Sequence, residues 1–182
     1  MKAEKLDSRR AYAGRLLKVD IDTVRMPNGK KVELEMVRHP GAAAVVPLLS
    51  EPDSEDPQVL LLRQYRYAAG GMIWEIPAGV LEAGEDPAAC ASRELREETG
   101  AEARHIQHLT TIYTTPGFTD ERIHIFLATG ITAGPADLQP DEMIEVRALP
   151  LSRVLEMIRD GEIVDGKSIA ALLYVAGFRL DL

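Results

Sequence analysis

Residues 79–101 constrain this chain more than any other segment, because acidic residues recur there at helical spacing between two glycines. The segment reads GVLEAGEDPAACASRELREETGA. Asp86 is a residue type that caps helix N-termini, Pro87 suits the first turn, and Gly100 suits the position after the last turn. These signals predict a helix over about residues 87–99.

One face of this predicted helix carries three carboxylates, since Glu94 and Glu98 are four positions apart and Glu97 is three from Glu94. Like charges on one face repel and destabilise a helix. Mg²⁺ and Mn²⁺ prefer carboxylate oxygens and would remove this repulsion. The alternative interpretation is a solvated acidic face, which would suit each glutamate taken alone. Together with the flanking glycines, Glu85 and Arg93, the cluster predicts a metal site for phosphate chemistry.

The rest of the chain combines short strand patterns with helix patterns at irregular intervals. Strands are expected at residues 15–25, 31–38, 42–49, 59–65, 72–76, 105–113, 122–131 and 143–149, and further helices at 151–159 and 168–178. This order lacks the regular strand–helix repeat of a doubly wound parallel sheet, so a mixed α+β fold is favoured. Residues 1–40 predict an extra antiparallel β segment ahead of the core.

Charge and composition exclude several classes of function. The formal net charge of −8 argues against a protein that binds nucleic acid through a basic surface. A phosphate substrate would therefore be attracted by local cations. Cys90 is the single cysteine, which excludes an internal disulfide, and we expect it to pack as a small apolar residue. No segment suits a secretory signal or a bilayer span, so we expect a cytoplasmic protein without a membrane partner.

The fixed positions of residues 79–101 resemble the signature of the Nudix hydrolases throughout. The match comprises Gly79, Glu85, Arg93-Glu94-Leu95, Glu97-Glu98, Gly100 and the apolar Ala101, at the spacing of that family. The resemblance implies an α/β/α sandwich with a mixed β-sheet. It implies a Nudix hydrolase domain at residues 41–182, preceded by the β segment at residues 1–40 as the dimerisation element of a homodimer.

The resemblance also implies a site for two or more Mg²⁺ ions, or Mn²⁺ in their place. The carboxylates that match the bridging ligands of the family are Glu94 and Glu98, and Glu97 is the third candidate ligand. The carbonyl group of the residue before the first glycine, here Ala78, often adds a ligand in this family. Such ions mask the charge of a diphosphate and make a water molecule nucleophilic.

Further residues of the motif support these ligands. Arg93 and Glu85 match positions that orient the acidic side chains, and Arg93 precedes Glu97 by four positions, so these two can pair on the helix. Glu97, Arg93 and Glu85 are therefore assigned to the catalytic machinery. Glu82 lies where several ADP-ribose hydrolases place a metal or substrate contact.

Pro116 narrows the resemblance to the ADP-ribose pyrophosphatase branch, which carries a proline at a similar distance after the motif. The neighbouring residues resemble the loop of that branch, and so do residues 38–42, 63–66 and 167–173. Pro116, Gly117, Phe118 and Glu121 are therefore candidate substrate contacts. The alternative interpretation of Pro116 and Gly117 is an ordinary turn.

One arginine and one glutamate outside the motif complete the expected site. Arg66 is the candidate phosphate contact, because a guanidinium group matches two phosphate oxygens, and the alternative is a surface arginine at a strand end. The branch takes its general base from a glutamate on a late loop, where Glu142 matches best and Asp141 and Glu145 are alternatives. The chain departs from the branch at Leu34, where an arginine is common.

The leading hypothesis is a Mg²⁺- or Mn²⁺-dependent hydrolase that splits ADP-ribose into AMP and ribose 5-phosphate. The motif acts on the diphosphate, so another nucleoside diphosphate sugar, or a dinucleotide such as FAD or NADH, is the alternative substrate. A different class of function is a Nudix-like module that binds ADP-ribose without cleaving it. Such modules usually lose glutamates of the motif, and this chain retains them.

Overall fold

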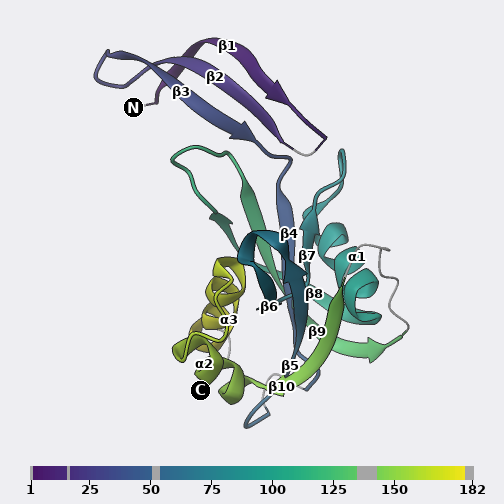
Figure 1. Ribbon diagram of the computed structural model, residues 1–182. Coiled ribbons are helices and arrows are strands. Elements are labelled where there is room, and N and C mark those ends of the chain that lie inside the picture. Colours follow the sequence, from purple (N-terminus) through teal and green to yellow (C-terminus); the bar gives the residue numbers. More distant parts are fainter. Residues whose placement is uncertain (1, 16, 51–53, 135–142, 179–182) are drawn as a thin grey trace. The chain divides into compact units, whose positions relative to one another are not determined.

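The computed structural model describes residues 2–15, 17–50, 54–134 and 143–178, which form two compact units (Figure 1). The first unit combines the N-terminal residues up to Gly41 with Ile112–Arg122, and the second combines Ala42–Thr111 with the residues from Ile123 onward. The mixed class expected from the sequence, with strands and helices interspersed, is confirmed. The division at residue 40 into a dimerisation segment and a hydrolase domain stays a prediction.

The first unit is built on an antiparallel sheet in the order β1-β2-β3, with β1 at Glu4–Ala13, β2 at Lys18–Arg25 and β3 at Lys31–Arg38. The sequence predicted β2 and β3 but not β1. Every residue of β1 is exposed, so its sequence lacks the alternation of apolar and polar side chains that signals a half-buried strand. Leu34, at which the chain departs from the arginine common in the ADP-ribose pyrophosphatase branch, is an exposed residue of β3.

β2 buries two carboxylates, because Asp20 and Asp22 alternate onto the same face of the strand. Arg38 of β3 donates hydrogen bonds to both carboxylates, Arg10 of β1 donates to Asp20, and Ser8 of β1 donates to Asp22 at 2.6 Å. The hydrogen bonds from Ser8, the larger contribution, and from Arg38 hold the pKa of Asp22 below its ordinary value. The three strands are therefore joined by charged side chains as well as by their backbones.

The second unit contains two further sheets, apart from the strand-end residues 112, 113 and 122, which belong to the first unit. A mixed sheet has the order β7-β4-β9-β8, with bounds Ala78–Val80, Ala42–Pro47, Arg122–Ala133 and Ala101–Tyr113. Within it, β4 pairs antiparallel with β7 and parallel with β9. An antiparallel sheet has the order β10-β5-β6, with bounds Ile144–Pro150, Gln58–Arg66 and Gly71–Glu75.

Helices contact β4, the strand whose residues are all buried. α1 (Pro87–Thr99) packs Leu95 into a core that includes Val45 of β4, and α3 (Gly166–Phe178) contacts β4 as well. α2 (Leu151–Arg159) contacts α3 and β10. Strand and helix layers of this kind agree with the sandwich that the resemblance to the Nudix hydrolases implies (Figure 1). Among the helices in the described part of the chain, none combines the length and the apolar composition needed to cross a membrane.

α1 begins and ends where its sequence predicted. The side chain of Asp86 accepts hydrogen bonds from the N–H groups of Ala88 and Ala89 at 3.1 and 3.2 Å. Gly100 adopts a φ of 70° and donates to the carbonyl of Arg96 at 2.8 Å, which closes the last turn. β7 was not predicted, because three residues are too few to show an alternating pattern. The other predicted strands and helices differ from the observed elements by a few residues at their ends.

Candidate active site on the acidic helix

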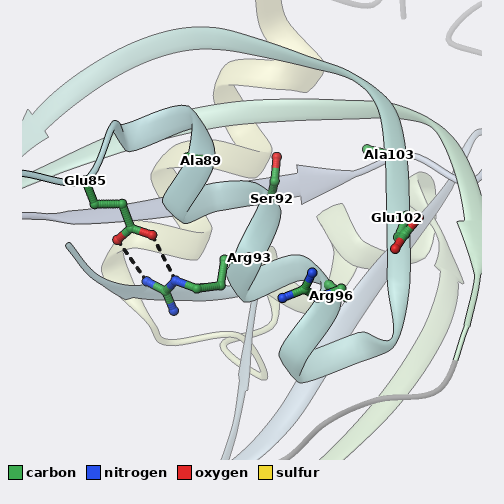
Figure 2. Close-up of a pocket in the computed structure, with 7 residues that line it drawn as sticks. All are labelled: Glu85, Ala89, Ser92, Arg93, Arg96, Glu102 and Ala103. Carbon is green, nitrogen blue, oxygen red and sulfur yellow. Dashed lines mark hydrogen bonds and ion pairs between the residues drawn. The ribbon is translucent and has the colours of Figure 1, made fainter. Parts of the chain in front are cut away.

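Arg93 of α1 joins three glutamates of the acidic segment through one guanidinium group. Its Nε and Nη2 donate to the two carboxylate oxygens of Glu85 at 2.9 and 3.0 Å, which Figure 2 shows as two dashed lines. Its Nη1 donates to Glu94 at 2.6 Å and to Glu97 at 3.2 Å. Because Glu85 precedes the helix, Arg93 connects the loop before α1 to the helix itself.

This network fixes the charge of Glu85. The hydrogen bonds from Arg93, followed by that from the N–H group of Glu82 at 2.9 Å, lower the pKa of Glu85 to about 2. The Glu85 carboxylate in turn raises the pKa of Arg93. Both groups are therefore ionised at neutral pH. The side chain of Glu82, a predicted substrate contact, is exposed.

Glu94 occupies the space beside the backbone of Gly79 in β7. A Cβ atom at position 79 would lie 1.8 Å from Oε1 of Glu94 and 2.0 Å from its Cδ. Such distances are far shorter than van der Waals contact, so a side chain at position 79 would force the carboxylate of Glu94 to move. Gly79 therefore lets the carboxylate of Glu94 lie directly against the backbone of β7.

Glu98 is buried, with 3 % of its surface exposed, and its Oε2 accepts a hydrogen bond from the N–H group of Ala78 at 3.0 Å. Ala78 belongs to β7 and pairs with Ala44 of β4. The carbonyl of Pro77 accepts a hydrogen bond from Val45 at 2.9 Å, which anchors the start of β7 to the same central strand. The structure thus brings together the predicted ligands Glu98 and Ala78.

The candidate ligands offer only oxygen donors, namely three carboxylates on α1 and the backbone of Ala78. Hard divalent cations prefer this donor set. Within the described residues, no three aspartate, glutamate, histidine or cysteine side chains already converge on one point. Glu94 and Glu97 contact Arg93, and Glu98 contacts β7. A bound cation would therefore compete with the Arg93 guanidinium for the same oxygens.

Arg66, the candidate phosphate contact, lies at the end of β5 and pairs with Glu75 of β6. Its Nε and Nη2 donate to the two oxygens of Glu75 at 2.7 and 2.9 Å. These hydrogen bonds raise the pKa of Arg66 above its ordinary value, and the charge of Glu98 acts in the same direction. Arg66 therefore lies within electrostatic reach of the acidic helix, and 42 % of its side chain is exposed.

Sequence reasoning assigned no role to Glu75 or Lys167, which contact each other next to Arg66. Glu75 is buried and accepts a hydrogen bond from the ammonium group of Lys167 in addition to those from Arg66. The available signal was a glutamate between Trp74 and Ile76, inside an apolar run, where a charge is costly unless it is paired.

The predicted substrate loop belongs to the first unit. The carbonyl of Phe118 accepts a hydrogen bond from Val37 at 2.7 Å, and Glu121 accepts one from the hydroxyl of Thr114 at 2.8 Å. Residues 116–118 are exposed. The loop and α1 belong to different units, so the role of this loop in substrate binding stays a prediction.

The candidates for the general base precede or belong to β10. Glu142, which matched best, and Asp141 fall outside the described residues. Glu145 lies on β10, where it is exposed and accepts a hydrogen bond from Arg147 at 3.1 Å. Its partner across the sheet is Arg63 of β5. The identity of the base therefore stays a prediction.

A groove of about 470 Å³ is lined by residues of α1, of the loop before it and of the start of β8 (Figure 2). Its lining residues are Glu85, Ala89, Ser92, Arg93, Arg96, Glu102 and Ala103. Glu94, Glu97 and Glu98 are not among them. Within the described residues, the groove therefore reaches the ion pair that supports the acidic face but not the candidate metal ligands.

The NUDIX domain family model matches residues 38–172 of this chain. A Bacillus methanolicus protein named methanol dehydrogenase activator is 40% identical over 166 residues, covering 90% of this chain and 87% of its own. The ADP-ribose pyrophosphatase of Bacillus subtilis (strain 168) is 37% identical over 166 residues, which cover 90% of this chain and 87% of that relative. A crystal structure of an ADP compounds hydrolase matches with a TM-score of 0.81 over 98% of this chain and 94% of that chain, at 21% identity, which shows a shared fold.

Proposed function

The chain belongs to the NUDIX domain family, and on that basis we propose that it hydrolyses the diphosphate of ADP-ribose to AMP and ribose 5-phosphate. Support comes from the Bacillus subtilis relative, an ADP-ribose pyrophosphatase that resembles this chain over nearly its whole length. The observation that carries the proposal is the Arg93 network, which gathers three glutamates of the motif beside α1 while Glu98 is buried next to Ala78.

Members of this family generally need a divalent cation, usually Mg²⁺. The residues of this chain fit such an ion, because Gly79 leaves space for the carboxylate of Glu94 and because the candidate donors are all oxygens. We propose that Glu94 and Glu98 hold two or more Mg²⁺ ions, or Mn²⁺ in their place, with Glu97 and the carbonyl of Ala78 as further ligands. When bound, such ions mask the charge of the diphosphate and make water nucleophilic.

The remaining roles belong to residues around these ligands. Arg93 and Glu85 orient the carboxylates of α1, since the guanidinium group of Arg93 contacts both Glu85 and Glu94. Arg66 contacts a phosphate through the exposed part of its guanidinium group. Glu142 takes the proton from the attacking water. Binding of the rest of the substrate is assigned to Glu82, Pro116, Gly117, Phe118 and Glu121.

The motif recognises a diphosphate, so other nucleoside diphosphate sugars and dinucleotides such as FAD and NADH are the alternative substrates. A module that binds ADP-ribose without cleaving it is disfavoured, because such modules usually lose glutamates of the motif and this chain keeps them. Comparison of kcat/KM for ADP-ribose, GDP-mannose, FAD and NADH, with and without Mg²⁺, tests the proposal.

We expect ADP-ribose to give the highest kcat/KM in this panel and to remain intact without a divalent cation. A higher kcat/KM for another compound would replace the proposed substrate while keeping the reaction. Calorimetric binding of ADP-ribose with Mg²⁺ present and without product would replace the enzyme by the binding module.

We also propose that the protein is a homodimer and that the first unit contributes the contact. The support is β1, whose residues are all exposed and include the large apolar side chains of Leu6 and Tyr12. Sedimentation at micromolar concentration is expected to give about twice the chain mass of 20.0 kDa. A single species at the chain mass would overturn the dimer.

A further inference from the structure

Residues 75–78, which join β6 to β7, are each held by a hydrogen bond or ion pair to another element of the second unit. The contacts run from Arg66 and Lys167 to the carboxylate of Glu75, from Ile76 N–H to the Ser168 hydroxyl at 2.9 Å, from Val45 N–H to the Pro77 carbonyl at 2.9 Å, and from Ala78 N–H to Glu98 at 3.0 Å. One end of this segment therefore contacts the acidic helix, and the other end contacts Arg66 and the first turn of α3.

Four charged side chains alternate in sign at the Glu75 end of this segment. Arg66 pairs with Glu75, Glu75 with Lys167, and Lys167 with Asp165 at 3.0 Å. The side chains of Glu75, Lys167 and Asp165 are 3, 13 and 19 % exposed, whereas that of Arg66 is 42 % exposed. The chain of charges is therefore neutral as a whole and presents its positive end, Arg66, to solvent.

The buried carboxylate of Glu75 depends on both of its cations. Burial alone would raise the pKa of Glu75, but the hydrogen bond from Arg66 and the charge of Lys167 outweigh burial and hold the pKa below its ordinary value. Without Lys167, Arg66 would be the only one of these two cations left to neutralise the buried carboxylate. The carboxylate would then lose one of the contacts that fix its position, and the guanidinium group that it holds through two hydrogen bonds would be less firmly oriented toward a phosphate.

One nitrogen of the Arg66 guanidinium group is not used by Glu75. Its Nε and Nη2 are used by Glu75, while its Nη1 makes no hydrogen bond to any residue that the structure describes. The bidentate contact with Glu75 prevents rotation of the planar guanidinium group. The direction of Nη1 is therefore set by the carboxylate of Glu75.

We propose that Lys167 is a positioning residue for diphosphate hydrolysis, which shares the carboxylate of Glu75 and thereby keeps the guanidinium group of Arg66 aimed at a substrate phosphate. The inference rests on the proposed function, because it assigns Lys167 a role in binding the diphosphate substrate. Lys167 acts through Glu75 and Arg66, without touching substrate or metal itself.

The variant Lys167→Met tests the inference, because it removes the ammonium group and keeps an apolar side chain. We expect the KM for ADP-ribose to rise about tenfold, the amount that corresponds to one weakened charge-assisted hydrogen bond. We expect kcat to change less than about twofold, since the lost interaction serves binding in the ground and transition states alike. Lys167→Arg restores the charge and is expected to recover most of the affinity.

A double-mutant cycle separates this role from a structural one. In the Arg66→Ala background, Lys167→Met is expected to cause no further rise in KM, because the group that it positions is gone. If the two substitutions instead multiply their effects on KM as independent changes do, Lys167 acts elsewhere and the inference is overturned. Lys167→Gln serves as a second variant should Lys167→Met fail to fold, and the same cycle applies to it.

Arg153→Met is the matched control, because it also replaces a cation by methionine in the C-terminal helices. Arg153 of α2 pairs with Glu156 and Glu162 at the surface and lies outside the contacts of residues 75–78. Its KM is expected to equal that of the wild-type protein, with thermal denaturation confirming that each variant is folded. If the wild-type protein does not hydrolyse ADP-ribose, the proposed function fails; if it does and Lys167→Met keeps the wild-type KM, only the inference about Lys167 fails.

Discussion

Gly79 and Glu94 occupy the same small space, in which a Cβ atom on residue 79 would lie 1.8 Å from the Oε1 atom of Glu94. The strand β7 and the helix α1 therefore approach each other through a glycine and a carboxylate. This contact places a proposed metal ligand directly beside the backbone of β7, one residue beyond Ala78.

Gly79→Ala is expected to displace the carboxylate of Glu94 and to lower kcat/KM for ADP-ribose by roughly 10- to 100-fold, the usual cost of disturbing a ligand through its surroundings. The dependence of the rate on Mg²⁺ concentration should shift to higher concentration. Gly177→Ala in α3 is the control, because a Cβ atom there meets nothing within 4 Å. Wild-type Mg²⁺ dependence in Gly79→Ala would show that the position of Glu94 is unimportant.

Glu98→Gln is expected to lower kcat by at least about 100-fold at saturating Mg²⁺, because an amide is a poor ligand for a hard cation. The amide oxygen can still accept the hydrogen bond from Ala78, so the thermal midpoint should change little. The control is Glu102→Gln, at an exposed position of β8. It makes the same change of charge, and Glu102 does not contact Ala78. Hydrolysis at the wild-type rate by Glu98→Gln would refute the assignment of the ligand.

The ion pair between Glu85 and Arg93 is expected to make stability depend on pH in the acid range. The pKa of Glu85 is about 2 in the folded protein and 4.5 ordinarily, so the pair contributes its full stabilisation above pH 4.5 and loses it as the pH falls through about 2. The difference in free energy of unfolding between wild type and Glu85→Gln should therefore be constant near neutral pH and shrink below pH 4.5. Urea unfolding at a series of pH values measures it, and a difference that does not change with pH would contradict the prediction.

Cys90 is expected to be unreactive in the folded protein. Its side chain is fully buried in the core, and burial raises the pKa of the thiol to about 12, so the reactive thiolate is scarce at neutral pH. A disulfide reagent such as DTNB should label the native protein very slowly and the protein unfolded in guanidinium at once. Rapid labelling of the native protein would show that α1 opens readily from the sheet.

Local signals explain why α1 was predicted well and why its main ion pair was not. Asp86 and Gly100 lie at the two ends of α1 and act within one helical turn, so their effect can be seen in the sequence alone. Helical spacing also predicted that Arg93 meets Glu97. The residue to which Arg93 donates two hydrogen bonds is Glu85, which precedes the helix. No periodicity in the sequence relates a loop residue to a helix residue.

Tertiary contacts explain the residues that the sequence did not reveal. Glu75 meets Arg66 across a hairpin and Lys167 across 92 positions of the chain, and only the folded structure brings these three together. The exposed strand β1 was missed for a different reason, since it is held by backbone pairing and by polar side chains that leave no apolar pattern. The base at Glu142 and the loop around Pro116 rest on resemblance alone.

The parallel pairing of β4 with β9 has a consequence for the order in which the chain can fold during synthesis. Residues 42–47 of β4 pair with residues 123–128 of β9, and α1 lies between them in the chain. A nascent chain that ends before residue 123 can form the turns of α1 and the short pairing with β7, but it leaves one edge of β4 open. That edge is a wholly apolar strand of six residues, which is a template for pairing with other chains. Release of β9 from the ribosome therefore closes the edge at which the unfinished protein is most prone to aggregate.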